Sequence, residues 1–355
     1  MSLPLVLAAV LFVGVLAYGV FGGADFGSGL YDLTAGGDRR GAELRTRIDH
    51  SLGPVWEANH VWLIFVLVMW WSAFPQAFAS AMDTLMLPML LALLGIVLRG
   101  ASFAFRKYAV DLRQARAFGV VFAVSSVITP FFLGTVAGGI ASGRVPFGTR
   151  GDRIEAWLNP TSLVGGVIAV GTCGFLAGVF LTADATRAGS RALAATLRTR
   201  TLVVGGATGL AVFAGLLPLR EDAPTLWSGL TGRALPLVVI AAVAGLATMV
   251  LLWRHRPGAA RLPAVVAVGA VLSGWGVGQY PWLLVDHVTI AQAAGATATL
   301  EALLVAVGVA VVVVLPALVW LLVVAQQDAG HEGPDRAQAD AGAAASSSAR
   351  RTASA

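Results

Sequence analysis

The sequence predicts an all-α, polytopic membrane protein with about nine transmembrane helices, its N-terminus outside and its C-terminus in the cytoplasm. Three observations predict this class: the composition, the length of the apolar runs and the distribution of arginine. Hydrophobic residues make up 57% of the 355-residue chain, and charged residues only 12%. Water-soluble domains carry about 25% charged residues, so the composition argues against that class.

The apolar runs are long enough to cross a bilayer, which takes about 20 mostly apolar residues per helix. A helix satisfies its own backbone hydrogen bonds in lipid, and these runs are too long for barrel strands. We expect spans at about 3–31, 55–74, 80–104, 117–142, 161–184, 201–219, 234–253, 262–284 and 301–325. Because the connecting loops are short, residues 1–327 are expected to form one helical bundle. The low-complexity sequence of residues 328–355 predicts a disordered cytoplasmic tail.

The first span begins MSLPLVLAAVLFVGVLAYGVFGG, which lacks the charged start of a secretory signal. We therefore expect it to remain in the protein as a helix. It carries two acidic residues, Asp25 and Asp32. Seven residues are two helical turns, so both carboxylates are expected on one face, stepping toward the cytoplasm.

The second span starts near GPVWEANHVWL, residues 53–63. Glu57 would lie close to the helix N-terminus, where the helix dipole favours an anion, and His60 would lie one turn deeper. Trp56 and Trp62 are placed like interface anchors or packing groups, and Asn59 belongs to the same motif.

The later spans contribute one buried cation and several packing signals. Arg99 falls near the inner end of the third span, whereas Asp83, Asp184 and Glu301 fall near span ends, where solvated or capping roles are expected. Cys173 is the single cysteine, which excludes internal disulfides and a cysteine metal cluster. Glycines four residues apart let helix backbones approach closely, and they occur at Gly19, Gly23, Gly27, Gly134, Gly138, Gly174, Gly178, Gly274 and Gly278.

Basic residues give the orientation. Arginine and lysine concentrate at 39–47, 106–116, 187–200 and 254–261, after alternate spans, and in the tail. The positive-inside rule places those segments in the cytoplasm. The formal net charge of +5 is therefore a topology signal, and no basic face indicates a nucleic-acid partner.

This topology brings Asp25, Asp32, Glu57, His60 and Arg99 to the cytoplasmic half of the membrane. Ionisable groups inside a bilayer cost about 2.5–3.5 kcal/mol each on insertion scales and face a bundle interior or cavity. One interpretation is a route for protons, because carboxylates and an imidazole pass protons when water links them. The other is structural: Asp25 or Glu57 pairs with Arg99 or caps a helix, and Arg99 pairs within the chain or contacts a partner.

Haem ligation by this chain alone is not expected. A bis-histidine site needs two imidazoles facing each other at one depth. Of the five histidines, only His60 falls well inside a span. The chain also lacks a P-loop, a dinucleotide fingerprint and a nucleophile elbow.

Three early segments identify a family. GADFGSGLYDL, IDHSLGPVWEANHVWLIF and LPMLLALLGIVLRGASFAFR resemble subunit II of the cytochrome bd-type quinol oxidases. The later segments GTCGFLAGVFLTADATR and GWGVGQYPWLLVDHVTIAQAAGATATL are similar as well, so the resemblance spans roughly residues 10–305 in order.

The resemblance implies a non-haem subunit of an enzyme of the bacterial cytoplasmic membrane that couples quinol oxidation to the reduction of oxygen to water. Haems b and d and the quinol site are then expected in a partner, subunit I. Subunit II binds no haem through its own ligands and is associated with proton supply from the cytoplasm and, in some members, with a structural quinone. Small accessory subunits and membrane lipid are further expected partners.

The resemblance also bears on single residues. Asp25 matches the family's aspartate in the first helix. Glu57 stands where many members have aspartate, so a carboxylate is retained with a reach one methylene longer. His60 replaces a residue that is commonly Gln or Glu, which weakens a proton-relay role for it.

A different class of function uses the same residues. A stand-alone proton- or ion-coupled transporter could employ these carboxylates as its coupling site. Such transporters show broken helices in paired repeats, and the sequence shows no convincing repeat.

Replacing Glu57 by Gln tests the proton route. With assembly and haem content intact, we expect Glu57→Gln to slow oxygen-dependent quinol oxidation, because the helix-start carboxylate is removed without a large change in size. Oxygen uptake by purified enzyme measures this rate. Normal turnover in the variant would leave Glu57 a structural role.

Overall fold

The computed structural model describes residues 2–36, 38–52, 56–106, 108, 112–313, 316, 317 and 320. At 38–40, 49–52, 56–58, 112 and 115 it describes the helical backbone alone. Residues 1–301 form one compact unit and residues 302–355 a second. The expected tail, 328–355, and the start of the second span at Pro54 lie outside the described residues.

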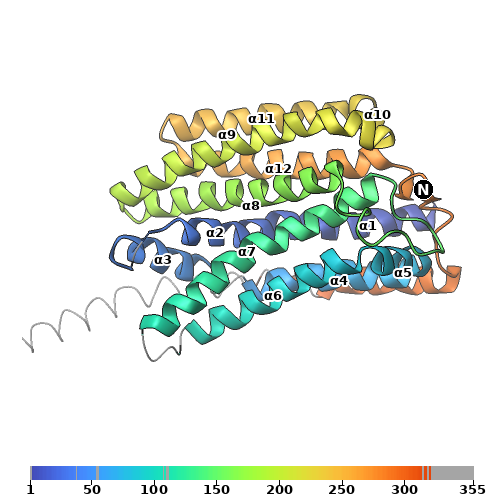
Figure 1. The fold of residues 1–355 in the computed structure, drawn as a ribbon, viewed down its shortest axis with the longest axis horizontal. Coiled ribbons are helices and arrows are strands. Elements are labelled where there is room, and N and C mark those ends of the chain that lie inside the picture. The colour runs from blue at the N-terminus through green and yellow to red at the C-terminus, as the bar shows by residue number, and fades with distance from the viewer. Residues whose placement is uncertain are drawn as a thin grey trace, which may run out of the picture. The chain divides into compact units, whose positions relative to one another are not determined.

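Helices make up nearly all of the regular structure (Figure 1). Their bounds are α1 Leu3–Ala17, a π-helical turn η1 Tyr18–Gly22, α2 Gly23–Leu33, α3 Asp38–Leu52, α4 Trp56–Ala73, α5 Pro75–Thr84, α6 Met86–Arg106, α7 Leu112–Ala141, α8 Pro160–Arg187, α9 Arg191–Asp222, α10 Pro224–Thr231, α11 Leu235–Trp253 and α12 Pro257–Gln279. Two short antiparallel strands follow, β1 Trp282–Leu284 and β2 Val288–Thr289, and then an apolar helix, Thr297–Val313.

The all-α membrane class is confirmed. In the described part of the chain, seven helical segments are long and apolar enough to cross a membrane, or eight if the bent pair α4–α5 is one span. The expected ninth span, 301–325, overlaps the helix Thr297–Val313. Most of its remaining residues lie outside the described ones. A count of nine and the orientation of the termini stay predictions.

The second and third spans differ in detail from the sequence prediction. We expected the third at 80–104, but the chain breaks at Leu85 and α6 begins at Met86. The segment before the break forms α5, which bends from α4 by 118°. Pro88 explains the break, because it has no N–H to donate to the Thr84 carbonyl four residues earlier. Ser80 and Thr84 accept hydrogen bonds from the backbone N–H groups of Gly148 and Gly151, in the loop after α7.

The eighth span is shorter than expected. Its helix, α12, ends at Gln279 rather than near residue 284. Pro281 follows two residues later and has no N–H to continue a helical ladder. The chain then turns into the hairpin of β1 and β2, and His287 lies in the turn of this hairpin.

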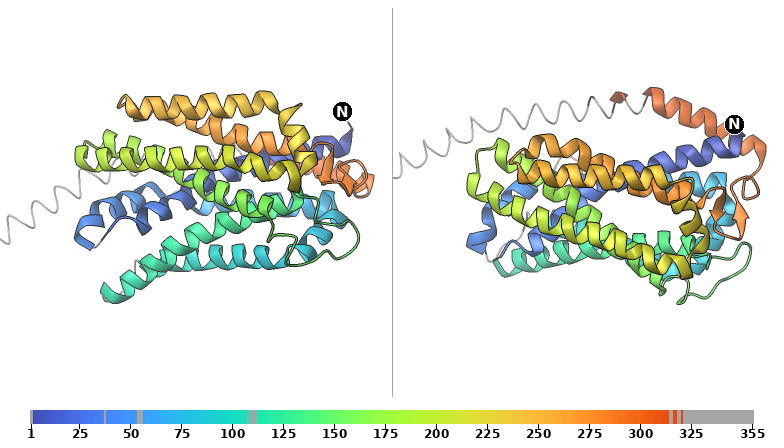
Figure 2. Two further views of the ribbon diagram at one scale, coloured as in Figure 1. Left: turned by 45° about the horizontal axis from the view of Figure 1, so that its top comes forward. Right: turned by 90° about the horizontal axis from the view of Figure 1, so that it is seen from above.

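Helices α8 and α2 organise residues 1–301. Helix α8 packs against α2, α7, α9 and α12 (Figures 1 and 2). Helix α2 packs against both α7 and α8, and its glycines permit the approach. An ideal Cβ on Gly27 would lie 1.9 Å from the Cys173 carbonyl oxygen of α8, and one on Gly29 would lie 2.2 Å from Ser126 Cβ of α7. The carboxylates of α2 are thereby held inside the bundle.

Candidate functional site

Two buried ion pairs join α2 to α6. Asp25 on α2 lies 2.5 Å from Arg99 on α6, measured from Oδ1 to Nη2. Asp32, two turns further along α2, lies 3.2 Å from Arg106, measured from Oδ2 to Nη1. Both helices therefore carry charges seven residues apart, acidic on α2 and basic on α6, and the two sets match in order.

Arg99 is enclosed almost completely, with 3% of its surface exposed. Its Nη2 also donates to the Asp25 carbonyl oxygen at 3.0 Å, and its Nη1 donates to Ser126 Oγ on α7. Its guanidinium carbon lies 5.0 Å from the ring centre of Phe26 and 4.3 Å from that of Phe122. A carboxylate, a hydroxyl and two aromatic faces together replace the water that this cation loses.

The two aspartates differ in how their oxygens are used. Asp32 Oδ1 accepts from Arg45 Nε of α3 at 2.8 Å, and its Oδ2 faces Arg106, so both oxygens are engaged. Asp25 uses Oδ1 for Arg99, while its buried Oδ2 has no hydrogen-bond partner among the described residues. A buried acceptor without a donor is uncommon. Asp25 Oδ2 is therefore the carboxylate oxygen of this cluster that remains available to a donor.

Further polar groups surround Asp25. Ser28 Oγ donates to the Asp25 carbonyl oxygen at 2.6 Å. Tyr18, in the π-helical turn, interacts electrostatically with both Asp25 and Arg99, and its hydroxyl is buried without a partner among the described residues. The charges of Asp25 and Arg99 also act on the thiol of Cys173 on α8. Single π-turns inside α-helices occur frequently at functional sites.

Residues 56–63 of the GPVWEANHVWL motif lie at the start of α4. His60 stacks edge-on against Phe26, with ring centres 6.3 Å apart, so one phenylalanine contacts both His60 and Arg99. Asn59 is buried, and its Nδ2 donates to the Phe21 carbonyl oxygen at 3.3 Å. Trp62 packs edge-on against Phe65. The side chains of Trp56 and Glu57 lie outside the described residues.

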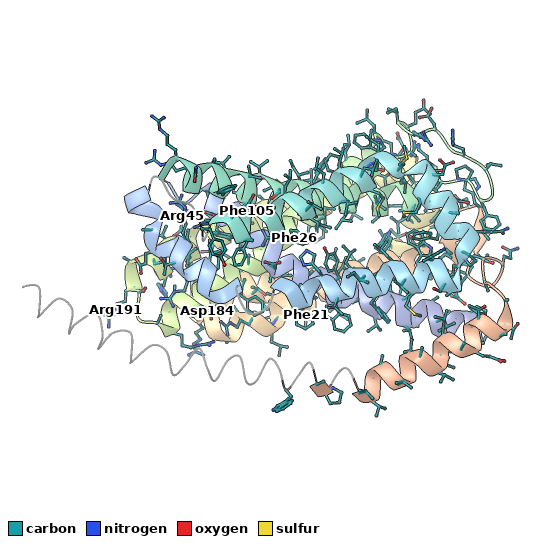
Figure 3. The ribbon with its side chains drawn as sticks, turned by 90° about the horizontal axis from the view of Figure 1, so that it is seen from below. Phe21, Phe26, Arg45, Phe105, Asp184 and Arg191 are labelled. Atoms are coloured by element: carbon teal, nitrogen blue, oxygen red, sulfur yellow. The ribbon has the colours of Figure 1, made fainter. Side chains whose placement is uncertain are left out.

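The cluster extends along the long axis of the bundle. In Figure 3, Phe26 lies nearer the middle of that axis and Arg45 nearer one end. The Asp25 pair is accordingly deeper than the Asp32 pair, whose arginines Arg45 and Arg106 have side chains 25% and 18% exposed.

The acidic residues near the span ends also meet arginines. Asp83 binds Arg150 and Arg153 at 2.9 and 2.7 Å, and Asp184 binds Arg261 of α12. In the loop after α7, Asp152 accepts hydrogen bonds from the backbone N–H groups of Glu155 and Ile154, which lower its pKa. These contacts clamp loops and helix ends.

The described side chains offer no metal centre. No three of their His, Cys, Asp or Glu groups lie close enough to hold an ion. His255 contacts Arg198, and His287 Nε2 lies 2.9 Å from the Gly143 carbonyl oxygen, so neither faces His60. The side chains of His50 and His331 lie outside the described residues.

Arg99 was expected as a candidate partner of Asp25, but the partners of Asp32 were not expected. Arg45 and Arg106 stood out only as loop charges, and Ser126 not at all. One signal could have found Arg106: its distance of seven residues from Arg99 repeats the distance from Asp25 to Asp32. Nothing in the sequence marks Ser126, because an isolated serine in an apolar helix has many roles.

Comparisons with known proteins bear on the whole chain. A model of the family "Cytochrome bd terminal oxidase subunit II" matches residues 3–325. The curated "Cytochrome bd ubiquinol oxidase subunit 2" of Bacillus subtilis (strain 168) is 30% identical over 172 residues, covering 47% of this chain and 48% of that protein. "Cytochrome bd-I ubiquinol oxidase subunit 2" of Escherichia coli (strain K12) is 30% identical over 171 residues, covering 45% and 44%.

These alignments span about half the length of each curated relative. A solved structure, "The structure of bd oxidase from Geobacillus thermodenitrificans", matches with a TM-score of 0.74 at 24% identity. That match covers 91% of this chain and 98% of the other. At this identity the structural match establishes the fold.

The depth of the two ion pairs predicts unequal costs of breaking them. Asp25→Asn should destabilise the protein by about 3–5 kcal/mol, because it leaves Arg99 charged and unpaired in the interior. Asp32→Asn should cost less, because Arg45 and Arg106 can turn toward solvent. Thermal denaturation of the purified variants compares the two.

The double variant Asp25→Asn/Arg99→Gln is the control. It should recover most of the stability lost in Asp25→Asn, since no buried charge remains uncompensated. Equal losses in Asp25→Asn and Asp32→Asn, or no recovery in the double variant, would contradict the assigned pairing.

Proposed function

The chain belongs to the cytochrome bd terminal oxidase subunit II family, and from that premise we propose that it serves a quinol oxidase that reduces oxygen to water. The match of the family model across residues 3–325 carries the proposal. The protein is a multi-pass protein of the bacterial cytoplasmic membrane. In this proposal it packs against a haem-bearing subunit I, which supplies the quinol site and haems b and d.

The described histidines of this chain fit a complex in which the partner subunit holds the haems. A haem iron needs imidazole, thiolate, thioether or phenolate ligands presented at one depth. The described histidines His60, His255 and His287 lie on α4, after α11 and in the β hairpin respectively. His60 is the one among them that lies within a spanning helix, where its ring packs on Phe26. In this proposal haem chemistry belongs to the partner subunit.

The chain's own contribution is the supply of protons from the cytoplasm. Asp25 is the group best suited to exchange a proton, because its Oδ2 is a buried acceptor without a hydrogen-bond partner among the described residues. Glu57 and His60 belong to the same route by their position in the first turns of α4, where the ring of His60 packs against Phe26. Arg99 holds the Asp25 carboxylate in place through Oδ1 and leaves Oδ2 available.

Asp32 has a different role in this proposal. Both of its oxygens are bound by arginines of α3 and α6. A carboxylate in this position fastens α2 to its neighbours and has no lone oxygen to offer a proton. The two aspartates of one helix face are thus divided into a proton-exchanging group and an anchor.

The transporter interpretation has no support from the comparisons. The family match and both curated relatives concern oxidase subunits. The bend between α4 and α5 is a break in a span, but Pro75 at the start of α5 accounts for it, because proline cannot continue the hydrogen-bond ladder of α4.

Isolation of the complex tests the proposed assembly. Affinity purification of this chain from its native membrane in mild detergent should co-isolate a multi-span haem protein with bd-type absorption. Reduced-minus-oxidised spectra and mass spectrometry of the eluate measure this. Recovery of the folded chain without any haem protein would refute the proposed oxidase role.

Charge-neutral exchanges test the division between the aspartates. Asp25→Asn/Arg99→Gln removes the proton-exchanging carboxylate without leaving a charge unpaired, and quinol-dependent oxygen uptake should fall. The matched control, Asp32→Asn/Arg106→Gln, should keep turnover close to that of the wild type at equal haem content. Similar rates in the two double variants would contradict a special role for Asp25.

A further inference from the structure

A second feature of the bundle lies away from the charged cluster. A cavity of about 420 Å³ lies among α8, α9, α11 and α12. Helix α9 packs closely along α8, and α11 along α12; α8 also packs against α12, whereas α9 and α11 meet less closely. Figures 1 and 2 show α9 and α11 along one side of the bundle. The cavity occupies the seam between the two helix pairs.

Glycines widen this seam. Gly206 and Gly209 on α9 and Gly245 on α11 line the cavity, and an ideal Cβ on any of them would meet no heavy atom within 4 Å. They differ from Gly27, where a Cβ would collide with the α8 backbone. Glycine in a helix is less stable than alanine by about 1 kcal/mol. Close helix packing therefore does not explain these three glycines, whereas an occupant of the seam does.

The cavity opens toward the membrane. Three of its lining residues are strongly exposed: Leu210 by 71% and Phe213 by 52% on α9, and Leu246 by 66% on α11. All three lie within helices long and apolar enough to span the bilayer. The mouth between α9 and α11 thus faces hydrocarbon.

The lining is unsuited to water. The volume would hold roughly 14 molecules at about 30 Å³ each, and each would need two to four polar partners. Thr172 and Thr208 both donate their hydroxyls to carbonyl oxygens of their own helices. Among the lining side chains, Trp275 Nε1 remains as a buried donor without an acceptor in the described chain.

The same features narrow the choice of occupant. A helix is about 10–12 Å across with its side chains, so a single 5.4 Å turn occupies about 400–600 Å³ and a spanning helix does not fit in the cavity. A quinone headgroup presents two carbonyl oxygens, for which the lining offers one free donor. A hydrocarbon chain with one ester carbonyl matches both the apolar wall and that donor. Trp275 lies four residues from the end of α12, about 6 Å along its axis, where lipid esters are found.

We propose that this cavity binds one acyl chain of a membrane phospholipid. The chain enters between α9 and α11, its ester carbonyl lies beside Trp275, and its tail runs past Gly209 and Gly245 toward Phe175 in the middle of α8. The bound chain fills the seam and joins the pair α8–α9 to the pair α11–α12. The site is separate from the charged cluster on α2 and does not depend on the proposed oxidase role.

Photolabelling tests the site. A phospholipid with a diazirine midway along one acyl chain is added to the purified complex in lipid nanodiscs and activated by light. Mass spectrometry then maps the labelled peptides. We expect label on residues 205–216 of α9 and 238–249 of α11, and loss of that label in Gly209→Leu/Gly245→Leu, whose side chains fill the cavity.

The matched control is Gly269→Leu on α12. A Cβ there also meets nothing within 4 Å, but Gly269 does not line the cavity, so labelling should stay at the wild-type level. Label confined to other surfaces of the wild-type protein, or equal label in the filled variant, would overturn the proposal. So would labelling of the lining by a photoactivatable quinone but not by the phospholipid. If the filled variant fails to fold, the wild-type map alone decides.

Discussion

The structure of residues 1–301 depends on keeping one cation, Arg99, inside an apolar bundle. A charge buried away from water is tolerated only when neighbouring groups replace its hydration. Asp25 supplies the opposite charge, Ser126 a hydroxyl, and Phe26 and Phe122 their aromatic faces. These groups come from α2 and α7, and Arg99 itself from α6, so satisfying one side chain fixes the positions of three helices.

Close packing of α2 makes that arrangement feasible. Gly27 and Gly29 bring its backbone against α8 and α7, where larger residues would collide. The carboxylates then cannot reach water and must find partners within the protein. Asp32 finds two arginines, and Asp25 finds one, which leaves an oxygen over. The same packing that makes the ion pairs obligatory also produces the unsatisfied group that we connect with proton supply.

The bundle uses glycine in two opposite ways. On α2, glycine removes space between helices, while on α9 and α11 it leaves space open. The first use gives a rigid interior around fixed charges. The second gives a seam that the membrane can fill, because hydrocarbon is the surrounding solvent and brings no hydrogen bonds to lose. Lipid can thus fill part of the interior of a membrane protein.

The sequence by itself determined the class, most of the spans and the family, because hydropathy and local motifs are properties of consecutive residues. It also placed Asp25, Asp32, Glu57, His60 and Arg99 in one half of the membrane. It could not decide which charges pair, since Arg99 is 74 residues from Asp25 and the choice depends on how α2, α6 and α7 pack. The cavity beside Gly245 was likewise decided by tertiary contacts, because α9 and α11 meet less closely than α8 and α12 do.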